Sequence, residues 1–316
     1  MKSEKISEKT DKCKGLSKVK QMDLRKDMKV SELIAEMSKS GVMGAGRIAL
    51  ACEIYREMKK NNAKIFFGLA GAMVPGGMKH IIIDLIERGY INVLVSTGAN
   101  LTHDLIEALG YSHLQGSSNV NDAELKNKGI DRIYDSFMPS EVYQGMEKFI
   151  NQHFLELSSQ KNIKEFLWKL GSLMPSGPKS ILRTCFEKKI PIFCPGIADS
   201  GIGLMMWNNI ASGKKTEINA FDDLKEMMDI AWTSKVKGVI YIGGGVPKNY
   251  IQQAMQLSTP ASFGIQITMD RPEPGGSSGA ELREGISWGK MNEKGRFVDV
   301  ICDATIALPI LVSAIL

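Results

Sequence analysis

Short apolar runs alternate with amphipathic segments through most of this sequence, and glycines end several of the runs. The runs lie in residues 63–71, 91–100, 188–203, 236–248, 261–269 and 297–304. Buried strands that alternate with helices form parallel sheets with crossover helices. The pattern therefore predicts an α/β fold: a doubly wound, mostly parallel sheet of six strands with helices on both faces.

The charge is concentrated at the start of the chain. Of the formal net charge of +5, residues 1–20 carry seven lysines and only three acids, Glu4, Glu8 and Asp11. We expect residues 1–22 to be a basic, disordered tail and residues 23–316 to be a single catalytic domain. The nearly neutral body argues against a nucleic-acid-binding protein.

Cysteine usage and hydropathy indicate the compartment. The five cysteines, Cys13, Cys52, Cys185, Cys194 and Cys302, lie far apart, without a CxxC pair or a nearby histidine. We therefore expect neither a disulfide nor a metal site, and we expect the protein to work in a reducing cytoplasm. No apolar run approaches the roughly 18 residues of a membrane span, and the first residues do not resemble a secretory signal.

Three glycine-rich turns follow predicted strands, at residues 68–77, 96–100 and 242–246. Glycine lets backbone N–H groups approach a phosphate closely, and the helix that follows offers its positive end. None of the turns matches GxGxxG, and any one of them is commonly just a tight turn. Together, at one edge of the sheet, they favour a nucleotide or a similar ligand.

Polar side chains stand at the same predicted edge. Asp199 and Asp303 end strands, and either would accept a ribose hydroxyl, although Asp303 would equally cap the next helix. His103 begins a helix beside the second turn, where contact with a ligand and simple packing are both open. His80, His113 and His153 show no ligand-like spacing.

Lys290 follows Trp288 and Gly289 directly in the stretch "EGISWGKMNEKG", residues 284–295. At an ordinary pKa near 10.4, only about four lysines in ten thousand are neutral at pH 7. Desolvation against an aromatic ring, or a nearby cation, would lower that pKa and release the amine as a nucleophile. The alternative is a surface lysine paired with Glu284 or Glu293.

Four motifs, in this order and spacing, resemble deoxyhypusine synthase: "YIGGGVPK", "GGSSGA", "EGISWGKM" and "ICDATIALPILV". The resemblance extends from about residue 25 to the C-terminus, and its forms look archaeal. It implies a Rossmann-like homotetramer, with active sites shared between subunits, that uses NAD. In the implied reaction, spermidine donates its aminobutyl group to Lys290 as an imine. The group then passes to a lysine of translation initiation factor 5A.

The resemblance also assigns roles to particular residues. Lys290 would be the catalytic residue. The implied NAD contacts are Gly71, Ala72, Met73, Val74, Pro75, Thr97, Gly98, Ala99, His103, Asp199, Met269, Asp270, Asp303 and Ala304. The implied amine contacts are Gly244, Asn249, Gly275, Gly276, Ser277, Glu284, Ser287 and Trp288.

The chain departs from the family's eukaryotic pattern at five of the positions that would surround the ligands. Carboxylates of that pattern are absent at Leu204, Ser277, Thr102 and His103, and Asn249 replaces a histidine. Each lost carboxylate would remove a charge-assisted hydrogen bond worth about 1.5–3 kcal/mol to an ammonium group.

These departures leave two alternatives open. One is an aminoalkyl transferase with another donor or acceptor, such as agmatine or a small amine that gives homospermidine-type products. The other is a catalytically idle paralogue within a mixed tetramer. The retained motif "SWGK" argues against it, because an idle chain has no need of an activated lysine.

Overall fold

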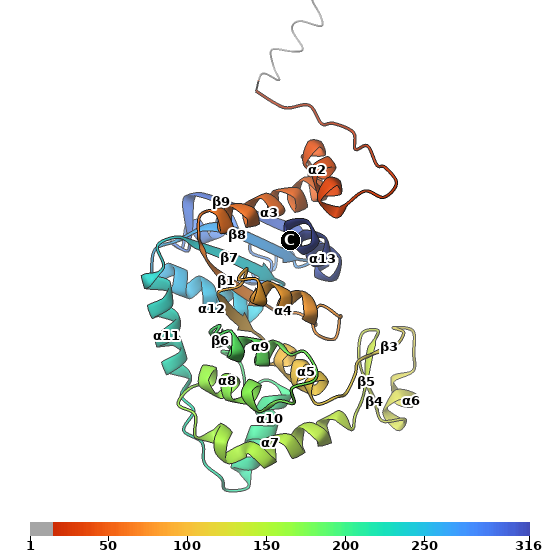
Figure 1. The fold of residues 1–316 in the computed structure, drawn as a ribbon, viewed down its shortest axis with the longest axis vertical. Helices are drawn as coiled ribbons and strands as arrows, with labels where there is room; N and C mark the ends of the chain where they lie inside the picture. The colour runs from red at the N-terminus through yellow and green to blue at the C-terminus, as the bar shows by residue number, and fades with distance from the viewer. Residues whose placement is uncertain (1–14) are drawn as a thin grey trace, which may run out of the picture.

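The computed structural model describes residues 15–316 (Figure 1). Residues 1–14 lie outside the described residues, and with them Cys13 and most of the predicted tail. Residues 15–29 contain no helix or strand. The disorder of the tail and its boundary at residue 22 stay predictions.

The main sheet has six parallel strands, as the sequence predicts. They are β1 (Lys64–Leu69), β2 (Val93–Ser96), β6 (Ile192–Phe193), β7 (Lys237–Ile242), β8 (Ala261–Thr268) and β9 (Met291–Ile301).

The order of the strands across the sheet is β6-β2-β1-β7-β8-β9. The first three strands of this sheet in the chain grow outward from β1 in one direction, and the last three grow outward from it in the other. This is the strand order of a dinucleotide-binding doubly wound fold, whose ligands bind where the order reverses. Here the reversal lies between β1 and β7.

Both faces of the sheet are buried. On β1, Ile65, Phe67 and Leu69 belong to one hydrophobic cluster, whereas Phe66 between them belongs to another. Alternate side chains of a strand point to opposite faces, so the two clusters are the two layers of the core. Helices α11 (Ala220–Thr233) and α12 (Gly245–Gln256) supply side chains to the cluster that contains Phe66.

Two N-terminal helices and the C-terminal helix pack together over the other layer (Figure 1). Helices α2 (Val30–Ser40) and α3 (Met43–Lys60) are separated at Gly41, which lies in the left-handed region at φ 70°, whereas Gly44 and Gly46 lie within α3. The apolar helix α13 (Ala304–Ile315) is docked on the core.

The remaining helices connect the strands or cover them. They are α4 (Lys79–Glu87), α5 (Gly98–Ala108), α7 (Val142–Ser158), α8 (Ile163–Leu173), α9 (Ile181–Glu187), α10 (Gly201–Ala211), α11 (Ala220–Thr233) and α12 (Gly245–Gln256).

The polar stretch between α5 and α7 adds a small antiparallel sheet that the sequence does not predict. Its strands are ordered β3-β5-β4, and the short helix α6 (Asp122–Asn127) precedes β4. This unit projects beside α5 and α7 (Figure 1). The bounds are β3 (Leu114–Gln115), β4 (Ile130–Ile133) and β5 (Ser136–Pro139).

The connection from β8 to β9 carries no α-helix. Residues 269–290 instead form a long loop with one 3-10 helix, η1 (Leu282–Ile286). Strand β9 begins at Met291, six residues before the predicted start at residue 297, so Lys290 immediately precedes the strand.

Cys52, Cys185, Cys194 and Cys302 are free thiols. None of the helices within residues 15–316 combines the length and the apolar character that crossing a bilayer requires.

Candidate active site

Three cavities adjoin one another beside β1 and β7. A large cavity of about 490 Å³ shares Val246 with a middle cavity of about 350 Å³. The middle cavity shares Asn249 and Ser277 with a small one of about 170 Å³. The shared residues place the three cavities next to one another.

The large cavity is built from the turns after β1, β2 and β6. Seven of the predicted cofactor residues line it: Gly71, Ala72, Thr97, Gly98, Ala99, His103 and Asp199. Five lining residues were not predicted: Ser96, Asn100, Ile133, Gly196 and Val246. Ile133 comes from the small antiparallel sheet, which no sequence signal connects to this edge.

The electrostatics of the large cavity suit a nucleotide. Helix α5 begins at its wall with Gly98 and Ala99, and a helix N-terminus attracts anions such as phosphate. The exposed Asp199 leaves the capping of α10 to Ser200, whose hydroxyl accepts from the Gly203 N–H. The Asp199 carboxylate is therefore available to a ligand hydroxyl.

The other predicted cofactor residues do not line this cavity. The side chains of Met73, Val74 and Pro75 are buried, and those of Met269 and Asp270 are exposed beyond β8. Asp303 caps α13: its carboxylate accepts hydrogen bonds of 2.7 Å from the Thr305 N–H and from the Thr305 hydroxyl. Ala304 is the first residue of that helix.

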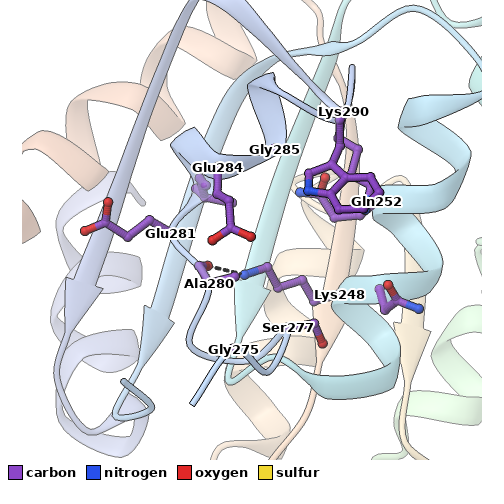
Figure 2. Close-up of a pocket in the computed structure, with 12 residues that line it drawn as sticks. Lys248, Gln252, Gly275, Ser277, Ala280, Glu281, Glu284, Gly285 and Lys290 are labelled. Atoms are coloured by element: carbon purple, nitrogen blue, oxygen red, sulfur yellow. Dashed lines mark hydrogen bonds between the residues drawn. The ribbon is translucent and has the colours of Figure 1, made fainter. Parts of the chain in front are cut away.

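The small cavity lies between α12 and the β8–β9 loop (Figure 2). Six of the residues predicted for catalysis and amine binding line it: Asn249, Gly275, Ser277, Glu284, Trp288 and Lys290. Gly285, within the implied run from Glu284 to Lys290, lines it too. The residues that were not predicted are Lys248, Gln252, Ala280, Glu281 and Leu282.

Lys290 is half-buried at one end of the small cavity. Its Nζ lies over the Trp288 ring, 4.9 Å from the centroid, so the predicted aromatic contact is present. No ion pair joins Lys290 to Glu284 or Glu293 within the described chain. The indole offers an apolar face to the amine and to any alkyl chain beside it.

Lys248 is a residue of the small cavity that the sequence analysis missed, although it ends the quoted motif "YIGGGVPK". Its buried Nζ donates to Gln266 Oε1 at 2.7 Å and to the Ala280 carbonyl at 2.5 Å (Figure 2). Burial lowers the pKa of this ammonium to about 8, with nearby Lys290 acting in the same direction. Asp299 and Glu284 oppose the shift. Lys248 therefore attaches the β8–β9 loop to α12.

Three predicted amine contacts do not line the small cavity. Gly244 packs against the loop, since a Cβ there would lie 2.4 Å from the Ser278 Cα. The Ser287 hydroxyl donates to the Glu284 carbonyl, and Gly276 faces open space.

Two of the positions that depart from the eukaryotic pattern lie away from the small cavity. The Thr102 hydroxyl accepts from the Ile202 N–H at the start of α10. Leu204 is exposed on α10, outside the three cavities.

Lys290 and Asp303 stand at opposite ends of β9. The strand has 11 residues, which at about 3.3 Å per residue separates its ends by roughly 30 Å. Within one chain, Lys290 is thus not at the carboxyl edge of the sheet, where the glycine turns gather. The small cavity extends from Lys290 towards that edge, where Ser277 and Asn249 border the middle cavity.

Comparisons with known proteins agree with one another. The family model of deoxyhypusine synthase matches residues 32–315. "Probable deoxyhypusine synthase 1" of Methanosarcina mazei is 46% identical over 92% of this chain and 91% of its own length. The protein of the same name from Archaeoglobus fulgidus is 40% identical over 93% and 96%.

A similar structure shows the same fold. The crystal structure of an Entamoeba histolytica protein that carries the same family name superimposes with a TM-score of 0.63, at 16% identity. The match covers 94% of this chain and 96% of that one.

Proposed function

Because this chain belongs to the deoxyhypusine synthase family of transferases, we propose that it transfers the aminobutyl group of spermidine to a lysine of translation initiation factor 5A. In this proposal Lys290 carries the group covalently, and NAD is the hydride carrier. The cytoplasm, where the acceptor is made and thiols stay reduced, is the proposed compartment.

The observation that carries the proposal is the environment of Lys290. A half-buried lysine lies over an indole ring, in a narrow cavity that also contains the Glu284 carboxylate (Figure 2). A nucleophilic amine, an apolar wall and an anion are the three groups that a polyamine donor requires. The carboxylate would bind an ammonium group of the donor, and Trp288 would cover its methylenes.

The large cavity fits the nucleotide that the reaction requires. Its volume of about 490 Å³ lies within the range of small-molecule sites, and it combines a helix N-terminus with the Asp199 carboxylate. NAD⁺, when bound, would accept the hydride lost by the amine and later return it. Gly98 and Ala99 would hold its phosphates, and Asp199 would accept from a sugar hydroxyl.

The covalent steps balance around Lys290. Loss of a hydride and a proton from the C–N unit of spermidine leaves an imine carbon. The neutral Lys290 amine attacks that carbon, and 1,3-diaminopropane departs as the new imine to Lys290 forms. The acceptor lysine then displaces Lys290 in the same way, and return of the hydride with a proton gives the saturated amine.

The distance between Lys290 and the carboxyl edge of the sheet supports an active site that is built from two copies of the chain. We propose a homotetramer in which the nucleotide cavity that serves Lys290 comes from a neighbouring copy of the chain. Several apolar side chains beside the cavities support this, because they are exposed in one chain: Val246 at 53%, Met269 at 64% and Trp288 at 58%.

The test combines a labelled donor with trapping. The protein, NAD⁺, labelled spermidine and factor 5A are incubated, and label is sought on the factor's lysine. Borohydride added without the factor should fix an aminobutyl adduct on Lys290, as read by peptide mass spectrometry. Lys290→Arg should abolish both signals, whereas Lys294→Arg, at an exposed lysine four residues on, should preserve both. Absence of label on the factor and of the adduct would refute the proposal.

A second candidate changes the donor or the acceptor. Two carboxylates, Glu281 and Glu284, line the small cavity together with Lys248 and Lys290, and Ser277 and Asn249 add no charge to it. A donor with fewer ammonium groups than spermidine, such as agmatine, suits that balance. Offering spermidine and agmatine together identifies the donor from the mass of the adduct on Lys290. Steady NAD-dependent turnover of an amine without factor 5A would favour a small-molecule acceptor.

A further inference from the structure

Four titratable side chains form a connected row that ends at the large cavity. Lys79, at the start of α4, is paired with Glu107 on α5. Glu107 Oε1 lies 2.7 Å from His113 Nδ1, and His113 Nε2 lies 2.9 Å from His103 Nδ1. His103 lines the cavity one turn of α5 before Glu107. The row thus connects a buried lysine to the cavity wall.

When His113 is neutral, the proton positions in this row follow from the carboxylate. Burial alone would raise the pKa of Glu107, but hydrogen bonds from His113 and Lys79 outweigh it and hold the pKa below its usual value. An ionised carboxylate only accepts hydrogen bonds, so His113 Nδ1 carries a proton. In neutral His113 the other nitrogen, Nε2, is then an acceptor, and the proton between the two rings belongs to His103 Nδ1.

His103 itself stays neutral under ordinary conditions. Burial lowers the pKa of its imidazole to about 4, with His113 acting in the same direction and Glu107 opposing. A neutral imidazole with its proton on Nδ1 has a lone pair on Nε2.

The other ring nitrogen of His103, Nε2, is free to bind a ligand. Within residues 15–316, the hydrogen bond to His113 engages Nδ1 of His103, and none engages Nε2. Buried side-chain atoms without a partner occur on Arg183, Tyr241 and Gln252, and the Nε2 of His103 is not among them. On a residue that lines the cavity, an unpartnered atom that is not buried is open to a ligand.

We propose that His113 and Glu107 are positioning residues that fix His103 as a hydrogen-bond acceptor for a sugar hydroxyl of the nucleotide in the large cavity. The identity of the ligand rests on the proposed function, whereas the tautomer of His103 does not. A hydroxyl donates to the Nε2 lone pair, but a phosphate in the same place has no proton to give at neutral pH. The row therefore also favours a free sugar hydroxyl over a phosphorylated one.

The first measurement needs no ligand. In protein labelled with ¹⁵N-histidine, the shifts of the two ring nitrogens report which one carries the proton. Four histidines are present, and loss of one signal set in His103→Gln assigns the residue. We expect His103 to be protonated on Nδ1, and to become a mixture of tautomers in His113→Phe. Protonation of His103 on Nε2 in the unmutated protein would overturn the proposal, whatever the protein binds.

The second measurement uses hydroxyl-deleted nucleotides. Dissociation constants are compared for NAD⁺ and for its 2′- and 3′-deoxy analogues on the adenosine and nicotinamide riboses. We expect one analogue to bind up to about 10-fold more weakly than NAD⁺. This ratio of dissociation constants corresponds to the free energy of one neutral hydrogen bond. His113→Phe should remove most of that difference.

Conservative variants separate this role from a merely structural one. His113→Gln can donate its amide N–H to Glu107 and accept from His103 Nδ1 with its amide oxygen, so it should retain the difference that His113→Phe loses. His80→Gln, at an exposed histidine outside the row, is the matched control and should behave as the unmutated protein. Equal penalties for the deoxy analogue in His113→Phe and in the unmutated protein would refute the role of His113. If the protein does not bind NAD⁺ at all, the proposed cofactor is refuted. The tautomer measurement alone then tests whether His113 and Glu107 fix the tautomer of His103.

Discussion

At the scale of single residues, the sequence predicted residues that line the small cavity better than the residues that support them. Lys290, Trp288 and Glu284 were predicted from a motif of adjacent residues, and they do line one cavity. Lys248 and His113 were missed because their roles depend on partners far along the chain. Lys248 donates to the carbonyl of Ala280, 32 residues away, and the spacing of the lysines in the sequence does not predict this contact.

His113 shows the same limit at shorter range. It lies ten residues after His103, a spacing that places two side chains together only because the chain turns back at the end of α5. Two histidines at i and i+10 carry no periodic signal. The turn, rather than the spacing, makes the contact.

Replacing Lys248 with methionine is expected to destabilise the protein. The variant fills the same volume but leaves the buried Gln266 and Ala280 oxygens without their donor, which costs about 1–3 kcal/mol. Thermal denaturation should show a lower melting temperature than for Lys225→Met, which removes an exposed lysine of α11. Equal melting temperatures for the two variants would show that the buried ammonium is not what holds the loop.

His103 predicts a pH dependence of stability. Its pKa falls from 6.5 in the unfolded chain to about 4 in the fold, so the unfolded state binds more protons between these values. Stability should therefore fall on acidification through this window, by about 2 kcal/mol between pH 7 and pH 5 from this residue. The groups that face the ring are His113, Glu107 and, across the cavity, Asp199.

The measurement is a difference between two proteins. Urea denaturation at both pH values is compared for the unmutated protein and His103→Gln, which lacks the titrating ring. The unmutated protein should lose more stability on acidification, by the amount given above. Parallel losses in the two proteins would contradict the assignment.

At the scale of elements, all six strands of the main sheet were predictable because each is an apolar run bounded by turn residues. Their neighbours in the sheet were not, because pairing depends on tertiary packing that no local pattern records. Strands β3, β4 and β5 were missed for another reason: they have two to four residues each and little buried surface. Such strands are too short to show an alternation.

The sequence predicts the start of β9 at residue 297, six residues too late, because the first part of the strand also lacks an apolar pattern. Residues 292–296, "NEKGR", are polar and partly exposed, as suits an edge strand that pairs on one side. Only the buried end of the strand, from residue 297, has the apolar pattern that identifies it.

The β8–β9 loop yields a prediction from two of its glycines. A Cβ on Gly279 would lie 1.9 Å from the Arg271 carbonyl oxygen, whereas one on Gly276 would meet nothing within 4 Å. Gly279→Ala must shift the backbone that carries Ala280 and the Lys248 contact, at a cost of about 1–3 kcal/mol. Gly276→Ala should keep the melting temperature of the unmutated protein.

Thermal denaturation and borohydride trapping together check this prediction. Gly279→Ala should melt earlier and trap less adduct on Lys290, because the wall of the small cavity moves. Stability equal to that of Gly276→Ala would mean that the loop accommodates the added methyl group without moving.

At the scale of the whole molecule, the separation of Lys290 from the carboxyl edge predicts complementation between subunits. Lys290→Ala removes the nucleophile, and Ala99→Trp fills the large cavity from an exposed position on its wall. Each variant alone should be inactive. If one site draws on two chains, tetramers assembled from both variants regain sites with an intact lysine and an open cavity.

The check is to co-express the two variants with different affinity tags and to isolate the mixed oligomers. Activity well above that of either parent is expected. Inactive mixed oligomers would show that each chain serves its own lysine. Light scattering of the same samples gives the number of chains in each assembly.

The two cavities are encoded by separate stretches of the chain. The large one is lined by residues between Gly71 and Asp199, with Val246 as the exception, and the small one by residues between Lys248 and Lys290. Substitutions after residue 246 can thus remodel the small cavity, the proposed amine site, without touching most of the walls of the large one, the proposed nucleotide site. Under the proposed function, a lineage that carries this fold is free to exchange one polyamine for another while its nucleotide cofactor stays the same. Divergence among its donors should accumulate in the last quarter of the gene.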